Sequence, residues 1–583
     1  MITRRARLLL LAALLGIGPG PAASQTATVD TAAPALLDYQ SIHHPVIARN
    51  GMVASQDRLA TEVGVEVLKD GGNAVDAAVA VGFALAVTLP RAGNIAGGGF
   101  MLVHLADSGK TIAIDYKEKA PMRADRDMFL GNDGKVDRDR ARLSHLSFGV
   151  PGTVAALADA LERYGTMSLA DVLAPAIRLA EEGFLVSDDL AYSFEFARDK
   201  LGDNAEARKI FFESDGTPLD FGDRLVQSEL AWSLRQLADD GPDAFYRGAI
   251  AKRIVSEMER HGGLVTMEDL SRFDAPERPV VRGTYRGYEL VFMPPPSSGG
   301  VHIIQMLNVM AKFDISESGA NTAKTAQIMV EAMRQAYADR AEFLGDPDFV
   351  DNPVAWLTSG AYAEETFQAI TPGRARSSKE VGAGRRPPEE SPDTTHFSVM
   401  DRFGNAVSNT YSLNFSYGSG KVIAGTGILM NNVMDDFSAN PGEPNAYGLI
   451  GGEANAIQPG KRALSSMTPT IVLREGKPFL VTGSPGGSTI ITSVLQQIVN
   501  VIDHDMNVLE SIVQPRFHHQ WQPDVVFVEP GFGVDTRVLL EDMGYDVQQR
   551  GGTLGSLQAI MWRDGIFYGG ADPRRPGASA LGY

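Results

Sequence analysis

The chain has no cysteine among its 583 residues, so disulfides, thiolate metal sites and a cysteine nucleophile are all excluded. It also lacks a hydrophobic run of the roughly 20 residues needed to cross a bilayer. The two candidates, residues 8–17 and 77–87, are both too short. Like charges do not cluster and the net charge is −19, which argues against nucleic acid as a partner. No repeat of fixed period is present, which disfavours solenoids and propellers.

The hydrophobic fraction of 44% is enough for a substantial core, so we expect a globular protein held together by packing alone. At the N-terminus, Arg4, Arg5 and Arg7 precede an apolar run, which is followed by helix-breaking residues and by small residues up to Ser24. This order is typical of a secretory signal peptide, residues 1–24, with an uncleaved anchor as the alternative. We therefore expect a periplasmic or secreted protein without a stable membrane anchor.

Two helices are expected between Ser55 and Pro90. Ser55 can cap the first helix, Gly71 and Gly72 can end it, and Asn73 can cap the second. The second helix is rich in alanine and apolar along most of its length, so we expect it to be buried.

The rest of the chain divides at one point. A helix-rich region is expected from about residue 150 to 270. The segment 372–393 has charged residues, Gly and Pro but no apolar periodicity, which predicts an exposed, flexible linker and a boundary. After it, three β-hairpins are expected around turns at residues 402–404, 474–477 and 563–565.

The first hairpin brings two hydroxyls together. If it turns near Phe403, the numbers of opposed residues sum to about 806, which places Ser412 opposite Thr394. Thr–Ser pairs are ordinary in sheets, so a structural role is the alternative. A threonine nucleophile needs a base, and its own α-amino group can serve once the chain is cut just before it. Such an amine titrates near ~7.7 to 8.0, so cleavage between Asp393 and Thr394 would create nucleophile and base together.

A glycine-rich turn, GSPGGS at residues 483–488, is expected to join a strand to a helix. The backbone amides of Gly486 and Gly487 can then point at a developing negative charge, as in an oxyanion hole. A tight turn without a catalytic role is the alternative.

Two further segments can bind an amino-acid head group. Asp435 or Asp436 can accept hydrogen bonds from an ammonium group, and the hydroxyls of Ser465 and Ser466 can donate to a carboxylate. A solvated turn is the alternative. The adjacent histidines at 518–519 cannot share one face of a strand or helix as metal ligands do, so we expect no metal.

Longer motifs make the chain similar to a known family. In the C-terminal part these are DTTHFSVMDRFGNAVSNTYSLN, GILMNNVMDDFS, PNAYGLIGGEANAI, KRALSSMTPTIV, TGSPGGS and PRFHHQW. In the N-terminal part they are GNIAGGGFML, AIDYKEKAP, SFGVPGTV and MPPPSSGG. They cover nearly all of the mature chain in the same order, and they resemble the small and large subunits of bacterial gamma-glutamyltranspeptidases.

The resemblance implies an α+β fold, a four-layer αββα sandwich of the N-terminal nucleophile hydrolase type. One precursor would cleave itself into two intertwined subunits, residues 25–393 and 394–583, and no cofactor would be needed. The residue roles that the resemblance implies are Thr394 as the nucleophile, Ser412 as the group that activates it, Gly486 and Gly487 as the oxyanion hole, Asn414, Asp436, Ser465 and Ser466 as contacts of the glutamyl head group, and Tyr447 on a lid.

Two positions depart from the family's pattern. The family usually has an arginine in its I-D-x-R-E motif to clamp the substrate α-carboxylate, and this chain has Lys117 there. Lysine keeps the charge but loses the bidentate fork. The residue after the NN pair is commonly Gln or Glu, a contact for the α-amino group, and here it is Val433. Both departures concern head-group binding rather than acyl transfer.

The sequence therefore predicts a self-processing gamma-glutamyltransferase and glutathione hydrolase. Its substrates would be glutathione and other γ-glutamyl compounds, with water, amino acids or dipeptides as acceptors. Two alternatives remain. One is a cephalosporin-acylase-like amidase of the same fold that takes glutaryl amides, and the other is a non-catalytic periplasmic binder of glutamyl peptides.

Overall fold

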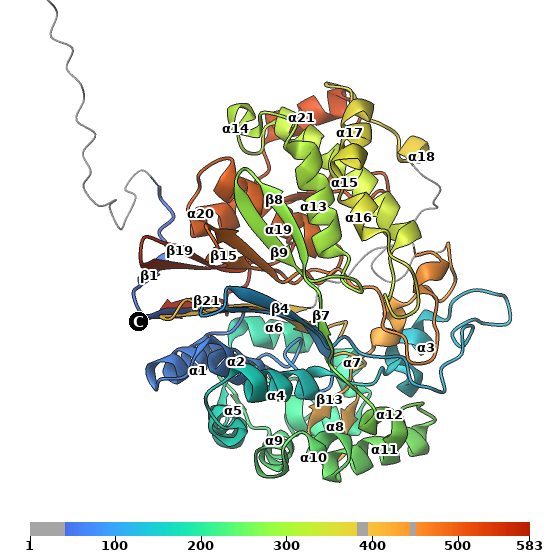
Figure 1. Cartoon of the computed structure of the whole chain (residues 1–583). Helices are drawn as coiled ribbons and strands as arrows, with labels where there is room; N and C mark the ends of the chain where they lie inside the picture. The colour runs from blue at the N-terminus through green and yellow to red at the C-terminus, as the bar shows by residue number, and fades with distance from the viewer. Residues whose placement is uncertain (1–40, 382–393, 443–450) are drawn as a thin grey trace, which may run out of the picture. The chain divides into compact units, whose positions relative to one another are not determined.

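Two seven-stranded antiparallel sheets stack face to face in the computed structural model, which describes residues 41–381, 394–442 and 451–583 (Figure 1). The strand order of the first sheet is β1 (Val46–Ala48), β20 (Ile566–Ala571), β19 (Gln558–Arg563), β15 (Lys477–Thr482), β14 (Thr470–Arg474), β9 (Tyr288–Phe292) and β8 (Val281–Tyr285). The order of the second is β21 (Ser579–Gly582), β2 (Gly51–Ser55), β10 (Thr395–Asp401), β11 (Ala406–Ser412), β3 (Gly98–Leu105), β4 (Lys110–Asp115) and β7 (Glu277–Arg278). The three predicted hairpins are β10–β11, β14–β15 and β19–β20.

The strands are apolar on both faces because each sheet is covered on both sides. Successive side chains of a strand point to opposite faces. In β2, Met52 packs between the two sheets, whereas Val53 packs against helices. In β3, Phe100 and Met101 divide in the same way. The interior therefore consists of three apolar layers, one between the sheets and one under each set of helices.

Helices cover the outer faces of both sheets (Figure 1). The first sheet is covered by α13 (Gly299–Met310), α15 (Ala323–Phe343) and α19 (Thr489–Ile502). The second is covered by α1 (Arg58–Lys69), α2 (Ala74–Thr88), α4 (Thr153–Tyr164) and α5 (Leu169–Glu182). The expected helix-rich region continues with α6 (Asp188–Phe196), α7 (Arg198–Gly202), α8 (Ala205–Phe211), α9 (Ser228–Asp240), α10 (Asp243–Tyr246), α11 (Ala249–His261) and α12 (Met267–Ser271). The predicted four-layer αββα architecture is confirmed.

The first two helices begin with different caps. Asn73 caps α2 as predicted, in a capping box with Asp76, and every residue of α2 is buried. The prediction that Ser55 caps α1 is wrong. Ser55 is the last residue of β2 and pairs with β21, so the cap falls to Asp57, whose side chain accepts a hydrogen bond from the amide of Ala60.

The expected linker, residues 372–393, is described only up to Val381. Part of this stretch is packed, although residues 372–374, 379 and 380 are exposed as predicted. It contains α18 (Ser378–Val381), where the amide of the buried Ser378 donates to Asp524 at 2.8 Å. The remaining linker residues, Asp393 included, and the predicted signal peptide lie outside the described residues. Within the described ranges, every helix is too short or too polar to cross a bilayer.

Candidate active site

The β10–β11 hairpin brings Thr394 beside Ser412. Thr395 pairs with Tyr411, which confirms the predicted register and places Thr394 directly before the strand. The Oγ1 of Thr394 donates a hydrogen bond to Ser412 Oγ at 3.4 Å, and both side chains are buried. A hydroxyl therefore stands next to another hydroxyl at the end of a central strand.

A pocket forms around Thr394 from segments that are far apart in the chain. Its wall includes residues from both of the predicted subunits. The lining residues are Lys117, Arg340, Thr394, Ser412, Asn414, Asp436, Leu464, Ser465, Ser466, Met467, Gly487, Ser488 and Ile490. The structure thus brings together eight predicted site residues, namely Lys117, Thr394, Ser412, Asn414, Asp436, Ser465, Ser466 and Gly487.

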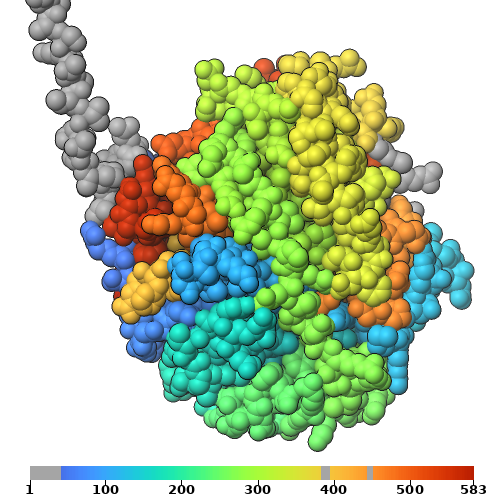
Figure 2. All heavy atoms as spheres, in the orientation of Figure 1, coloured from blue at the N-terminus to red at the C-terminus, as the bar shows by residue number. Residues whose placement is uncertain are grey.

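The segment of Asp436 packs against an excursion from the N-terminal half of the chain, residues 120–146. In Figure 2 this excursion, light blue, lies beside the orange C-terminal segment at the edge of the molecule. Apolar side chains join the two, among them Phe129, Met434 and Ile457. The excursion also includes α3 (Arg138–Leu143). Both halves of the chain therefore position the side of the pocket that contains Asp436.

Asn414 fixes the loop that follows β11. Its backbone is left-handed (φ 80°), a conformation that asparagine adopts more readily than most residues. Its amide donates to Ser412 Oγ at 2.9 Å, and its side-chain Nδ2 donates to the carbonyl oxygen of Asn432 at 3.1 Å. Asn414 therefore orients the Ser412 hydroxyl and ties the segment of Asp436 to the hairpin of Thr394.

The predicted glycine-rich turn joins β15 to α19. Gly486 and Gly487 both have positive φ, 132° and 56°. A Cβ at Gly486 would lie 2.5 Å from the Oγ1 of Thr489, so the position requires glycine. Gly487 lines the same pocket as Thr394, close to the first turn of α19, where the helix dipole favours negative charge.

Ser465 and Ser466 are held by the segment that precedes α13. The amide and the hydroxyl of Ser298 both donate to the carbonyl oxygen of Ser465, at 2.8 and 2.9 Å. The amide of Ser465 donates to the carbonyl oxygen of Pro296 at 2.8 Å. Hydrogen bonds to the predicted large subunit therefore hold Ser465, and with it the adjacent Ser466, in the pocket wall.

Lys117 is buried two residues after the end of β4, and its ammonium group contacts two carboxylates. Its Nζ donates to Asp436 Oδ2 at 2.8 Å and lies 3.3 Å from Glu118 Oε2. Burial alone lowers the pKa of Lys117, but the two carboxylates outweigh this effect and raise it. Burial also raises the pKa of Glu118. Lys117 is therefore charged at neutral pH, and the cation and the anion expected to hold a head group are already paired with each other.

Arg340, on α15, is a pocket residue that the sequence analysis missed. Its Nε donates to Ser298 Oγ at 2.9 Å, and its Nη2 donates to Ser466 Oγ at 3.3 Å. An arginine in a long helix is usually solvated, so the pattern of α15 gave no sign that this side chain turns inward. Arg340 places a second positive charge beside the serines.

Comparisons with known proteins show the family to which the chain belongs. The sequence model of the gamma-glutamyltranspeptidase family matches residues 60–582. The chain belongs to the gamma-glutamyltranspeptidase family. One relative is the glutathione hydrolase proenzyme of Escherichia coli (strain K12), which is 53% identical over 545 residues, 93% of this chain and 94% of that protein.

Solved structures share the fold of this family member. The cephalosporin acylase from Bacillus halodurans has a TM-score of 0.83 at 29% identity and covers 94% of this chain and 99% of that chain. The gamma-glutamyltranspeptidase of Helicobacter pylori has a TM-score of 0.55 at 45% identity and covers 56% of this chain and 93% of that chain. The likeness to an acylase and to a gamma-glutamyltranspeptidase supports the N-terminal nucleophile hydrolase type of fold.

One departure from the family pattern lies beside the pocket rather than in it. Val433 begins the short helix η2 (Val433–Asp436) and is buried. Its amide donates to Asn431 Oδ1 at 3.1 Å, and its side chain packs close to Gly149. Val433 has no polar side-chain group, so it cannot make the polar contact that the sequence analysis expected from Gln or Glu at this position.

The adjacent acids Asp435 and Asp436 have different surroundings. Asp436 lines the pocket, whereas Asp435 pairs with Arg142 at 3.3 Å. Burial raises the pKa of Asp435 to about 7, against the opposing effect of Arg142. Of the two acids, Asp436 is the one placed to meet a substrate. Tyr447, the expected lid residue, lies outside the described residues.

Proposed function

We propose that the protein is a self-processing gamma-glutamyltransferase and glutathione hydrolase. The observation that carries this proposal is a pocket in which Lys117 and Asp436, 2.8 Å apart, share the lining with Thr394. A γ-glutamyl group has an ammonium and a carboxylate on one carbon and the scissile amide three carbons further on. Such a group needs an anion, a cation and a nucleophile within one small pocket.

Thr394 is the proposed nucleophile. Cleavage between Asp393 and Thr394 frees the α-amino group, which takes the hydroxyl proton as Thr394 attacks the γ-glutamyl carbonyl carbon. The tetrahedral oxyanion is stabilised by Gly486 and Gly487. The amine then passes its proton to the leaving nitrogen, and an ester between Thr394 and the γ-glutamyl group remains. Water, an amino acid or a dipeptide attacks this ester and releases Thr394. Ser412 orients the hydroxyl throughout.

The head group of the substrate is proposed to replace the ion pair between Lys117 and Asp436 with two contacts of its own, one through its ammonium and one through its carboxylate. Its ammonium donates to Asp436, and its carboxylate accepts from Ser465 and Ser466 near the charge of Lys117. Because Lys117 and Asp436 already pair with each other, neither charge has to be desolvated anew when the zwitterionic head group binds. Asn414, Arg340 and a lid carrying Tyr447 complete the proposed site.

The proposed subunits are residues 25–393 and 394–583, and removal of residues 1–24 would deliver the protein to the periplasm or outside the cell. The strand order supports two intertwined subunits, because β10 and β11 lie between β2 and β3 in one sheet. A cut before Thr394 would leave those hydrogen bonds intact. We therefore expect the two subunits to stay associated after cleavage.

A second candidate function, a glutaryl amidase, is favoured by the likeness to the cephalosporin acylase from Bacillus halodurans. Two anilides separate the candidates, because a glutaryl anilide keeps the carboxylate of a γ-glutamyl anilide and lacks only the amino group. We expect kcat/KM to be about 10- to 100-fold higher for the γ-glutamyl anilide, the value of a charge-assisted hydrogen bond of about 1.5 to 3 kcal/mol to Asp436.

The opposite preference would favour the glutaryl amidase. A chain that remains uncut and binds glutathione without forming product would instead favour a non-catalytic binder. Measuring the two anilides together with the subunit pattern on a denaturing gel therefore distinguishes all three functions.

Replacing Lys117 with arginine tests the carboxylate contact. Arginine presents two parallel donors to a carboxylate where lysine presents one, so the KM for glutathione should fall roughly three- to tenfold with little change in kcat. Steady-state kinetics with glutathione measures this. The glutaryl anilide is the control, since it has the carboxylate and should gain by a similar factor. An unchanged KM for both compounds would remove Lys117 from carboxylate binding.

A further inference from the structure

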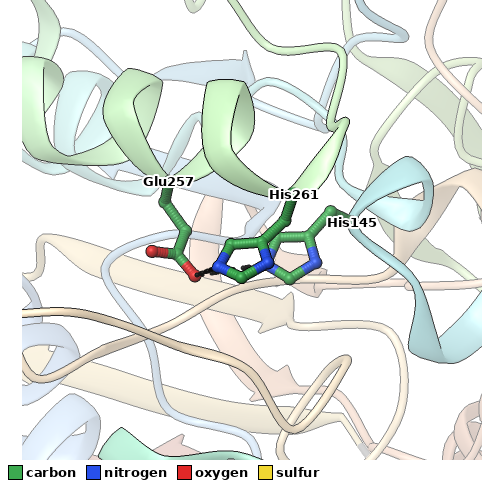
Figure 3. A group of neighbouring side chains, drawn as sticks. All are labelled: His145, Glu257 and His261. Carbon is green, nitrogen blue, oxygen red and sulfur yellow. Dashed lines mark hydrogen bonds and ion pairs between the residues drawn. The ribbon is translucent and has the colours of Figure 1, made fainter.

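A second cluster of ligand-type side chains lies outside the pocket of Thr394. It consists of His145, in the short helix η1 (His145–Ser147), and of Glu257 and His261, which are one turn apart in α11 (Figure 3). Both histidine rings lie against the same carboxylate oxygen. Glu257 Oε1 is 3.3 Å from Nε2 of His145 and 3.4 Å from Nε2 of His261.

These separations fit the edges of a metal coordination shell. In a tetrahedral zinc site with bonds of about 2.0 to 2.1 Å, neighbouring ligand atoms are roughly 3.3 to 3.4 Å apart. Two imidazoles and one carboxylate are a donor set that zinc accepts, with the fourth position left for water. We propose that His145, Glu257 and His261 form a binding site for a divalent transition-metal ion of the zinc type.

Neighbouring residues hold two of the three proposed ligands, His145 and Glu257, in place. The side chain of His145 is only 12% exposed. Its ring also packs against Phe148, with 5.2 Å between ring centroids. Glu257 is buried, and its other oxygen, Oε2, accepts from Arg260 at 2.6 Å. Arg260 therefore orients the carboxylate so that Oε1 faces the histidines, as partners behind metal ligands do.

The third proposed ligand, His261, has to rotate its ring before all three side chains can bind one ion. The rings of His145 and His261 are stacked, with centroids 4.6 Å apart and an angle of 16° between planes. A metal ion lies in the plane of each imidazole that binds it, so one ring has to rotate. His261 can do so, because its side chain is 48% exposed and it is the last residue of α11, directly before the left-handed Gly262.

Metal at this site would crosslink α11 to the segment of α3 and η1, which lies behind the head-group residues. Arg142, in α3, belongs to this segment; its carbonyl oxygen accepts from Asn432 Nδ2 at 3.0 Å and its side chain pairs with Asp435. The segment ends near Gly149, whose amide donates to Asn431 Oδ1 at 2.9 Å. The ion would thus brace the segment that leads to Asp436 without touching the pocket, so its role is structural.

The test uses the processed protein without a histidine tag, first treated with a chelator and then titrated with Zn²⁺. We expect one zinc ion per heterodimer by calorimetry and elemental analysis, and a rise in apparent Tm of at least about 2 °C. Co²⁺ should give the visible absorption of a tetrahedral nitrogen and oxygen site, and Mg²⁺ should change nothing, because it prefers oxygen ligands in octahedral geometry.

Three variants locate the ion. His261→Asn and His145→Asn should each weaken Zn²⁺ binding at least tenfold and abolish the rise in Tm. His44→Asn, which removes an exposed histidine elsewhere, should leave both unchanged. His261→Asn is the decisive variant, because the exposed side chain can be replaced without disturbing the fold. Zinc binding at the same affinity in His261→Asn and His145→Asn, or no stoichiometric binding to the unaltered protein, would overturn the proposal.

Discussion

Replacing Thr394 with alanine should leave a single uncut polypeptide and lower γ-glutamyl hydrolysis by a factor on the order of 10⁴ or more. The variant loses the hydroxyl that, in our proposal, attacks both the Asp393 carbonyl during maturation and the substrate later. The α-nitrogen of residue 394 also remains an amide, which cannot accept the hydroxyl proton. A denaturing gel and the intact mass report the cut, and release of the anilide chromophore reports the activity.

Two neighbouring substitutions control for an indirect effect on folding. Thr394→Ser keeps a hydroxyl on the same carbon, so it should still be cut and retain measurable activity. Thr395→Ala removes a similar buried hydroxyl one residue later, from a side chain that does not line the pocket, and should be cut normally. Two separate chains in the Thr394→Ala protein would place the nucleophile elsewhere.

The uncut variant should also keep the native fold, because the sheets do not depend on the cut. The hairpin of β10 and β11 is bonded on one side to β2 and on the other to β3. Its first residue is Thr395, so all of these bonds form in the precursor as well as in the mature protein. Loss of activity in Thr394→Ala can therefore be separated from unfolding by comparing the far-ultraviolet circular dichroism of the two proteins.

The local parts of the site could be predicted from the sequence because short-range geometry determines them. A tight turn near Phe403 fixes the register of a hairpin, and this was enough to place Ser412 beside Thr394. The glycine-rich turn before α19 could be recognised because its positive φ values leave little choice of residue. Asn73 could be recognised as a cap because Asp76 follows at the spacing of a capping box.

The remaining features depend on contacts between distant segments, and no local pattern indicates them. Lys117 and Asp436 are 319 residues apart in the chain. Arg340 enters the pocket only because α15 packs behind Ser298. The ligand-type cluster needed His145 to meet α11; the sequence alone offered only the Glu257 and His261 spacing of one helical turn.

Replacing Asp436 with asparagine should reverse the preference between the two anilides. The substitution removes the proposed partner of the substrate ammonium while Lys117 remains positively charged nearby. An ammonium group would then be buried beside a cation without a counter-charge, which costs about 2 to 5 kcal/mol. We therefore expect kcat/KM for the γ-glutamyl anilide to fall roughly 10²- to 10³-fold.

The glutaryl anilide separates ammonium binding from a general disturbance of the pocket. It has no ammonium group, so its hydrolysis by Asp436→Asn should change by no more than about threefold, and it should become the better of the two substrates. Asp435→Asn is the matched control: it makes the same substitution one residue earlier, in a side chain that pairs with Arg142 and does not line the pocket. It should leave the preference for the γ-glutamyl anilide intact. If Asp436→Asn instead lowers both activities equally, Asp436 acts by holding Lys117 in place, because both substrates have the carboxylate and only one has the amine.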